Sequence, residues 1–137
     1  VTALQGAREE IEFIWIGWMG GAAVPENEQE LVKDQLLAEH SCIPVFLDDE
    51  LVDKYYNGFS NDVLWPLFHY VPLPMYKAGG EKKFDNNLWE AYKLANIKFA
   101  EVVSSAYKDG DFIWVHDYHL MRLPYELRAR HPSCKIG

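Results

Sequence analysis

The chain has 137 residues, of which 49% are hydrophobic and 15% aromatic, a composition typical of a folded domain with one modest core. Its formal net charge of -8 argues against nucleic acid as a partner, and an anionic substrate would need a local cationic or amide-rich pocket. Apolar runs fall well short of the roughly 18 residues that a membrane span needs, and the N-terminus lacks the pattern of a signal peptide.

Two cysteines, Cys42 and Cys134, lie in apolar, strand-like contexts. We expect buried thiols and no disulfide framework, which indicates a reducing, cytoplasmic compartment. The chain has no initiator Met and starts directly in helical-looking sequence, so we expect it to be an excerpt from a longer protein.

Helical and strand-like patterns alternate along the chain. In order, the expected elements are residues 1–10 (helix), 11–18 (strand), 25–40 (helix), 42–47 (strand), 48–56 (helix start), 84–107 (helix), 112–115 (strand), 120–130 (helix) and 133–137 (strand). The helix over 84–107 is the clearest, because apolar residues recur along it at helical spacing. Such alternation predicts a doubly wound parallel sheet with right-handed crossovers.

Glycine and proline mark the expected breaks. Gly20 and Gly21 follow the first strand, where they allow a ligand to approach the backbone closely or form a plain turn. Gly58 and Pro66 are expected to break the stretch 56–70 (YNGFSNDVLWPLFHY). The Pro- and Gly-bearing residues after it, 71–83, are typical of a surface loop.

The stretch 111–120 (DFIWVHDYHL) places polar residues directly after a short apolar strand. Ligands of open α/β sheets bind at the carboxyl ends of parallel strands, so His116, Asp117 and His119 are candidates for a binding site. A metal site would need ligands from elsewhere, since adjacent side chains at a strand end diverge. Two alternatives stay open for Asp117: it binds substrate hydroxyls, or it caps the helix that begins at Leu120.

A second set of candidates lies within residues 55–65, where aromatic side chains are dense. Most apolar side chains there and just beyond are expected in the core, namely Phe59, Leu64, Leu67 and Phe68. Tyr56 and Trp65 are harder to place, because each has a polar tip that needs a partner, and sugar sites favour such rings. Walker, GxSxG, HExxH and GxGxxG motifs are absent, so the residues alone predict an α/β domain with a polar, aromatic ligand site.

Three motifs in the chain, CIPVFL, YYNGFSNDVLWPLFHY and WVHDYHLM, resemble the trehalose-6-phosphate synthase family, especially its eukaryotic members. VTAL followed by WIGWMG is similar to the stretch after that family's glycine-rich loop, so the resemblance covers essentially the whole chain. It implies the GT-B architecture, in which two Rossmann-like domains face a cleft. Residues 1–137 would then be part of one N-terminal, glucose 6-phosphate-binding (acceptor) domain, truncated at both ends and without the C-terminal donor domain.

The resemblance also implies site residues. In the family, the tyrosine of YYN, the tryptophan of LWP and the aspartate of HDYH line the glucose 6-phosphate site, and they match Tyr56, Trp65 and Asp117. Trp18 and His116 are secondary candidates. The implied role of Asp117 is to bind the sugar, not to act as a nucleophile, and neither a metal nor another cofactor is implied.

The implied activity is transfer of glucose from UDP-glucose to glucose 6-phosphate with retention, giving trehalose 6-phosphate and UDP. The isolated segment is expected to be inactive, because it carries only part of one site. The alternative is a non-catalytic, regulatory synthase-like domain, including one fused to a trehalose-phosphate phosphatase. The expected partners are a sugar phosphate and a nucleotide sugar, with no nucleic acid or membrane; a homo-oligomer and a phosphatase partner or fusion stay open.

Overall fold

The structure is a computed structural model that describes residue 6 and residues 11–21, 24–71 and 84–137. The helix expected over 1–10 and nearly all of the expected loop over 71–83 lie outside these residues. The chain divides into two compact units, residues 1–46 and 47–137, and each unit is described by itself. Among the described residues, no helix is both long and apolar enough to cross a lipid bilayer.

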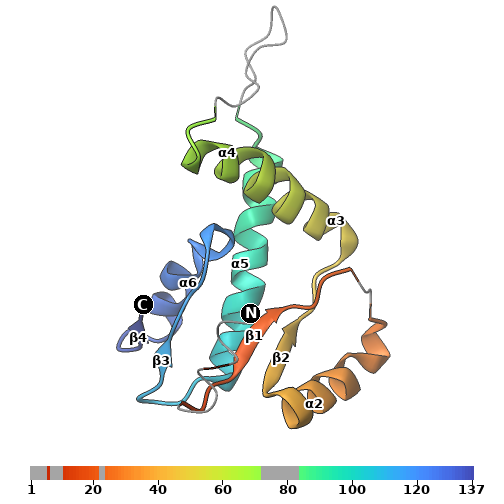
Figure 1. Cartoon of the computed structure of the whole chain (residues 1–137), viewed down its shortest axis with the longest axis vertical. Helices are drawn as coiled ribbons and strands as arrows, with labels where there is room; N and C mark the ends of the chain where they lie inside the picture. The colour runs from red at the N-terminus through yellow and green to blue at the C-terminus, as the bar shows by residue number, and fades with distance from the viewer. Residues whose placement is uncertain (1–5, 7–10, 22–23, 72–83) are drawn as a thin grey trace, which may run out of the picture. The chain divides into compact units, whose positions relative to one another are not determined.

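The described part of the first unit contains a pair of parallel strands, an α-helix and a short 3-10 helix (Figure 1). Its elements are β1 (Trp15–Trp18), η2 (Glu26–Glu28), α2 (Gln29–His40) and β2 (Cys42–Val45). Trp15 lies opposite Cys42 in the parallel ladder. Gly20 and Gly21 both have positive φ angles, 73° and 66°, so the loop after β1 uses conformations that glycine adopts without strain.

In the second unit, three consecutive segments form one continuous helical rod instead of a broken stretch. They are α3 (Asp49–Val52), η3 (Asp53–Leu64), whose hydrogen bonding is π-helical, and α4 (Trp65–Phe68). Asp48 caps the start of the rod, because its carboxylate accepts a hydrogen bond of 2.8 Å from the Leu51 N–H. The expected break at Gly58 and Pro66 is therefore wrong.

Gly58 and Pro66 each fit inside the continuous rod. A Cβ on Gly58 would lie 2.7 Å from Cδ2 of Leu88, so the glycine permits a close approach of the neighbouring helix. Pro66 lies just after η3, where the hydrogen bonding changes from π-helical to α-helical, and the residues before it, Leu64 and Trp65, keep helical angles.

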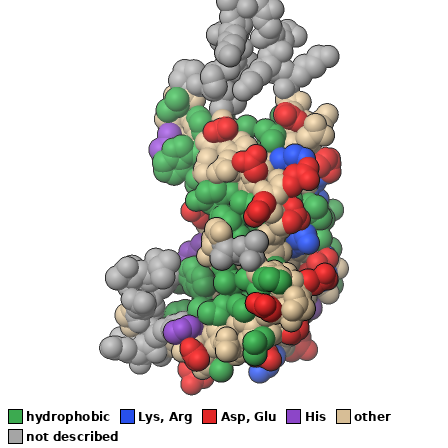
Figure 2. Space-filling model, turned by 90° about the vertical axis from the view of Figure 1, so that its right-hand side faces the viewer, with side chains coloured by type: hydrophobic (Ala, Val, Ile, Leu, Met, Phe, Trp, Pro, Cys, Tyr) green, Lys and Arg blue, Asp and Glu red, His purple; other side chains and the backbone are tan. Residues whose placement is uncertain are grey.

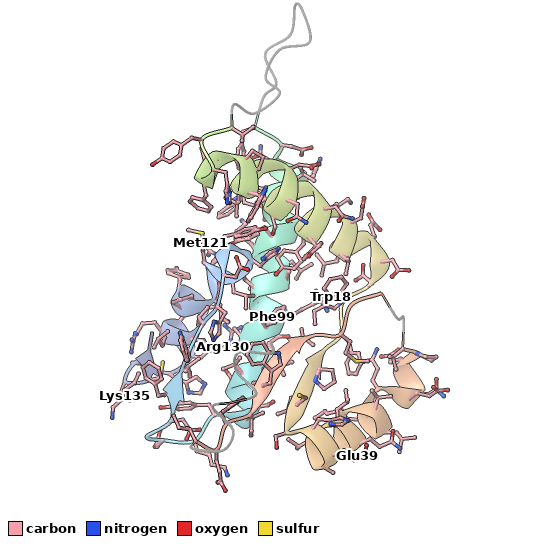
Figure 3. The ribbon with its side chains drawn as sticks, viewed as in Figure 1. Trp18, Glu39, Phe99, Met121, Arg130 and Lys135 are labelled. Atoms are coloured by element: carbon pink, nitrogen blue, oxygen red, sulfur yellow. The ribbon has the colours of Figure 1, made fainter. Side chains whose placement is uncertain are left out.

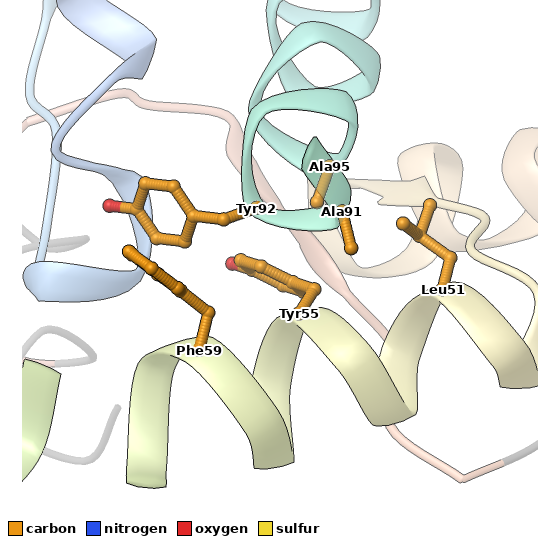
Figure 4. Packing of buried hydrophobic residues seen from close by; sticks show 6 residues of the cluster. All are labelled: Leu51, Tyr55, Phe59, Ala91, Tyr92 and Ala95. Carbon is orange, nitrogen blue, oxygen red and sulfur yellow. The ribbon is translucent and has the colours of Figure 1, made fainter. Parts of the chain in front are cut away.

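The long helix α5 (Asn86–Ala106) supplies the other half of the core. Asp85 caps it, accepting a 2.8 Å hydrogen bond from the N–H of Asn87. Figure 4 shows the packing between the rod and α5, whose buried residues are Leu51, Tyr55, Phe59, Ala91, Tyr92 and Ala95. Residues of the rod spaced by four face the same side, so one side of it meets α5. Burial of each large side chain contributes roughly 1.5–3 kcal/mol.

A second parallel pair leads into the C-terminal part of the chain. It is formed by β3 (Phe112–Ile113) and β4 (Lys135–Ile136), with η4 (Tyr118–Leu120) and α6 (Leu123–Arg130) between them. Hydrogen bonds from Val115 N to Gly137 O (2.8 Å) and from Gly137 N to Ile113 O (3.0 Å) extend the pairing. Asp117 therefore follows directly on the carboxyl end of a parallel strand, as the sequence predicts.

Some burial predictions are wrong. Leu67 and Phe68 are 56% and 47% exposed, because a single helical turn presents side chains all round its axis and buries only one side. Cys134 is buried as expected, but Cys42 is only half-buried, with its thiol 3.3 Å from the carbonyl oxygen of His40. Neither of these cysteines forms a disulfide in the described part of the chain, as the sequence analysis expects.

Candidate functional site

The turn after β3 begins at Asp117, whose backbone is strained. Its φ and ψ are 73° and 163°, a region that is almost restricted to glycine and costs a non-glycine residue about 1–3 kcal/mol. Its carboxylate accepts a 2.6 Å hydrogen bond from the N–H of Tyr118, so Asp117 caps η4. The side chain is still 56% exposed, and capping leaves carboxylate lone pairs available for a ligand.

One buried tyrosine fixes the middle and the end of this turn. The hydroxyl of Tyr92 donates a 2.7 Å hydrogen bond to the carbonyl oxygen of Tyr118 and accepts a 3.1 Å bond from the N–H of Met121, labelled in Figure 3. Burial raises the pKa of Tyr92 to about 12, although the bond from Met121 lowers it in part. The hydroxyl therefore stays protonated near neutral pH and keeps donating.

The carbonyl oxygen of His119 is held by two further side chains. Tyr55 donates to it from its hydroxyl at 3.2 Å, and Asn96 donates from its amide at 3.1 Å. Both donors are buried, and burial also raises the pKa of the Tyr55 hydroxyl well above its ordinary value. The strained turn is thus anchored from η3 and from α5, which explains how it persists.

Four aromatic rings then form a continuous row, which we call the ring row: Tyr56, His119, Tyr118 and Trp65. The ring of Tyr56 stacks on His119 with centroids 4.9 Å apart and an interplanar angle of 17°. His119 stacks on Tyr118 at 4.2 Å, and Tyr118 meets Trp65 at 5.6 Å. The hydroxyl of Tyr118 also donates a 3.0 Å hydrogen bond to Asn61 on η3.

His119 also faces the aspartate. Its Nδ1 lies 3.6 Å from Oδ1 of Asp117, and its Nε2 is buried without a hydrogen-bond partner within the part of the chain that the structure describes. Burial lowers the pKa of the His119 imidazole, and the nearby Asp117 carboxylate opposes that shift only in part. The imidazole is therefore predominantly neutral at pH 7.

The structure brings together the three main residues that the sequence singles out. Tyr56 and Trp65 belong to the ring row, and Asp117 reaches the row through His119. The ring of His69 lies 3.7 Å from that of Trp65. Trp65 is still 48% exposed, so part of its indole is open to solvent.

Of the two secondary candidates, His116 immediately precedes Asp117, and Trp18 is the last residue of β1. His116 packs its ring 4.6 Å from that of Trp114 on the preceding strand segment. Trp18 belongs to the first unit, whereas the ring row lies in the second.

Sequence reasoning missed the residues that hold the turn. Asn96 is fully buried in α5 but was not singled out, because one polar residue in an apolar stripe gives little signal in a periodicity pattern. Tyr92 was expected only as a core ring, although its hydroxyl bridges two backbone groups. A buried tyrosine needs a partner for its hydroxyl, and that requirement is the signal that could have identified it.

The ring row and Asp117 together carry one permanent charge, the carboxylate of Asp117. On the side of the molecule that faces right in Figure 1, Figure 2 shows acidic side chains interspersed with a few Lys and Arg side chains. Within residues 11–21, 24–71 and 84–137, no cluster of three or more His, Cys, Asp or Glu side chains could hold a metal ion. The site as described offers aromatic faces, hydroxyl donors and one carboxylate acceptor, which suits a polyhydroxylated ligand.

Residues 1–137 match the model of Glycosyltransferase family 20 along their whole length. The chain belongs to glycosyltransferase family 20. It is 53% identical over 128 residues to the UDP-forming alpha,alpha-trehalose-phosphate synthase 1 of Aspergillus niger, covering 93% of this chain and 23% of the relative. It is 52% identical over 141 residues to the Schizosaccharomyces pombe synthase, covering 100% of this chain and 26% of the relative. This family 20 chain thus spans about a quarter of the length of these curated relatives.

Solved structures of family relatives share the fold. A UDP-forming synthase from Burkholderia xenovorans, in complex with glucose 6-phosphate, matches with a TM-score of 0.73 and 28% identity over 99% of this chain and 28% of the other. The Candida albicans trehalose-6-phosphate phosphatase N-terminal domain matches with a TM-score of 0.68 and 30% identity. This match covers 89% of this chain and 24% of the other. These matches confirm the predicted fold class, a Rossmann-like α/β fold of the kind found in GT-B glycosyltransferases.

Proposed function

We propose that this family 20 chain forms the acceptor side of a UDP-forming trehalose-phosphate synthase, which transfers glucose from UDP-glucose to glucose 6-phosphate. The relatives named above support the proposal, because they carry that activity in their names and one of them was solved with glucose 6-phosphate. The observation that carries it is the ring row beside a strained, half-exposed aspartate, Asp117, which faces His119 beyond the carboxyl end of a parallel strand.

Each proposed site residue has a role that fits its chemistry. Asp117 accepts charge-assisted hydrogen bonds from sugar hydroxyls and so orients the acceptor. The hydroxyl of Tyr56 donates to the phosphate. Trp65 packs its exposed indole against the acceptor and donates from its N–H. Trp18 and His116 remain secondary positions in this proposal.

The same chemistry limits what these residues do. A dianionic phosphate normally binds cationic side chains, and none of the groups in the ring row is a permanent cation. We therefore place the phosphate-binding cations and the UDP-glucose site on parts of the complete synthase outside residues 1–137. Asp117 acts as a binder and not as a nucleophile, and the isolated segment is inactive. The proposal requires neither a metal nor another cofactor.

The proposal extends to location and partners. We assign the complete synthase to the cytoplasm, where sugar phosphates and nucleotide sugars are its small-molecule partners. The family resemblance also implies two further kinds of association. One is self-assembly of the synthase, and the other is a trehalose-phosphate phosphatase, either as a partner or as a fused domain.

A second candidate function is a regulatory, non-catalytic synthase-like domain. The likeness to the Candida albicans phosphatase N-terminal domain favours it, because a protein named for a different activity shares this fold. The retained set of Tyr56, Trp65 and Asp117 favours the synthase instead.

The test is an assay of UDP release by the complete synthase that we propose contains this chain. We expect turnover that depends on glucose 6-phosphate, and a strongly reduced rate at limiting glucose 6-phosphate for Asp117→Asn. Asp111→Asn is the matched control, because Asp111 also accepts a backbone hydrogen bond, from Lys108 at 2.9 Å, but lies before β3. A wild-type protein that folds but releases no UDP would support the regulatory alternative.

A further inference from the structure

His119 connects the two segments that supply the proposed acceptor site. Tyr56 and Trp65 come from the helical rod, whereas Asp117 comes from the turn after β3. The His119 ring stacks on Tyr56 at 4.9 Å, and its Nδ1 lies 3.6 Å from the carboxylate of Asp117. Its side chain therefore lies between a proposed phosphate contact and a proposed hydroxyl contact.

The position of this ring is itself fixed. The main chain of residue 119 is held by the hydroxyl of Tyr55 and the amide of Asn96, and its ring is covered on the other side by Tyr118 at 4.2 Å. The His119 side chain is only 18% exposed. A ring held from its backbone and against two neighbouring rings can transmit a fixed geometry to what it touches.

We propose that His119 is a positioning residue of the acceptor site: its ring supports the ring of Tyr56 while its Nδ1 orients the carboxylate of Asp117. The inference rests on the proposed function, because it needs an acceptor bound between these two side chains. Burial lowers the pKa of the imidazole, so a neutral His119 ring faces the Asp117 carboxylate at 3.6 Å without bringing a cation to the site.

The competing explanation is that His119 only fills space under Tyr56. Two variants separate the two roles. His119→Phe keeps a ring against Tyr56 but removes the nitrogen that faces Asp117, and His119→Asn keeps a donor near the position of Nδ1 but removes the stacked ring. In both variants, the backbone oxygen that Tyr55 and Asn96 bind is retained, so the turn keeps its anchors.

The chain offers a matched control in His131. Its ring packs on Tyr107 at 4.6 Å, and its Nε2 is also buried without a hydrogen-bond partner among the described residues. It lies at the C-terminal end of α6, and none of the proposed site residues is its ring partner. His131→Gln therefore reports the cost of losing a comparable packed histidine elsewhere in the same unit.

The experiment measures initial rates of the complete synthase against each substrate, for wild type, both His119 variants, His131→Gln and Asp117→Asn. Loss of orientation at a reacting group can cost up to about 100-fold, so we expect the KM for glucose 6-phosphate to rise about tenfold or more in both His119 variants. The KM for UDP-glucose should stay within about twofold of wild type, because a defect in acceptor positioning does not reach the donor.

The outcomes separate the inference from the function on which it rests. If wild type is active and Asp117→Asn is impaired, but both His119 variants behave like His131→Gln, the positioning role is refuted and the proposed function stands. A wild-type KM for glucose 6-phosphate in His119→Phe, with a raised KM in His119→Asn, would mean that His119 only fills space under Tyr56, which refutes the positioning role. Equal rises in the KM values for both substrates would assign His119 to general packing, which also refutes it. If wild type neither binds nor uses glucose 6-phosphate, the proposed function fails and the inference fails with it.

Discussion

Asn96, which is fully buried, donates a 3.1 Å hydrogen bond from its amide to the backbone oxygen of His119. The same amide donates to the carbonyl oxygen of Tyr92 at 2.9 Å, so one side chain ties the long helix to the turn that carries the candidate site. A buried polar residue of this kind links the stability of the fold to the geometry of the site.

Asn96→Ala should destabilise the protein by about 1–3 kcal/mol, because it removes a buried donor and leaves a cavity in α5. Thermal unfolding of the complete protein measures the effect. Asn57→Ala is the control, since Asn57 also donates a side-chain bond, to Asp53 at 3.0 Å, but is exposed. Equal losses for both variants would contradict the anchoring role of Asn96.

Replacing Asp117 should separate stability from binding. Glycine adopts the strained backbone angles of residue 117 freely, whereas alanine does not, so Asp117→Gly should be more stable than Asp117→Ala by about 1–2 kcal/mol. Both variants lose the carboxylate and should bind glucose 6-phosphate poorly. Thermal melts and calorimetry on the two proteins check this, and a more stable alanine variant would argue against strain at Asp117.

Gly58→Ala should cost about 1 kcal/mol, because the new methyl group would lie 2.7 Å from Cδ2 of Leu88 and the flexible end of that side chain must shift. Leu88→Val shortens the opposing side chain and should recover part of the loss. A double-mutant cycle from denaturant unfolding gives the coupling between the two positions. Strictly additive effects would mean that α5 does not approach the rod closely at Gly58.

The His119 imidazole predicts how stability depends on pH. Burial lowers its folded-state pKa below the ordinary value of about 6.5, so near pH 8 the ring is neutral in both the folded and the unfolded chain. As the pH falls below about 6.5, the unfolded chain binds the proton more readily, and the free energy of unfolding decreases. Melting temperatures between pH 8 and pH 5 should fall less steeply for His119→Gln than for wild type; identical slopes would contradict this contribution.

Local patterns in the sequence predicted most of the fold. The periodic apolar stripe predicted a helix over 84–107, and α5 spans Asn86–Ala106. The acidic residues at the start of the stretch 48–56 predicted a helix start there, and Asp48 caps α3 at that point. Alternating helices and strands predicted parallel pairing, which both strand pairs show. These features depend on neighbours in sequence, which is why periodicity and capping rules find them.

Features that depend on distant neighbours were not predictable. Gly58 lies inside the rod against Leu88, thirty positions away, whose Cδ2 would be 2.7 Å from a Cβ at Gly58; that contact is invisible in the local sequence. The exposure of Leu67 and Phe68 likewise depends on what covers α4.

The candidate site also combines residues that the sequence singles out with residues whose roles depend on distant parts of the chain. Motif resemblance identified Tyr56, Trp65 and Asp117. The dual nature of Asp117, a cap with an exposed carboxylate, shows that its two sequence-based alternatives are compatible. The supporting roles of His119, Tyr92 and Asn96 required coordinates, because their bonds join segments that are 23 or more positions apart.

The central claim is that Asp117 binds the acceptor sugar. Calorimetric titration of the complete synthase with glucose 6-phosphate in the presence of UDP, comparing wild type with Asp117→Asn and Asp111→Asn, tests it most directly. Loss of one charge-assisted hydrogen bond costs about 1.5–3 kcal/mol, so Asp117→Asn should weaken binding more than about tenfold while Asp111→Asn binds like wild type. Equal affinity in all three proteins would mean that Asp117 is only a helix cap and would contradict the account.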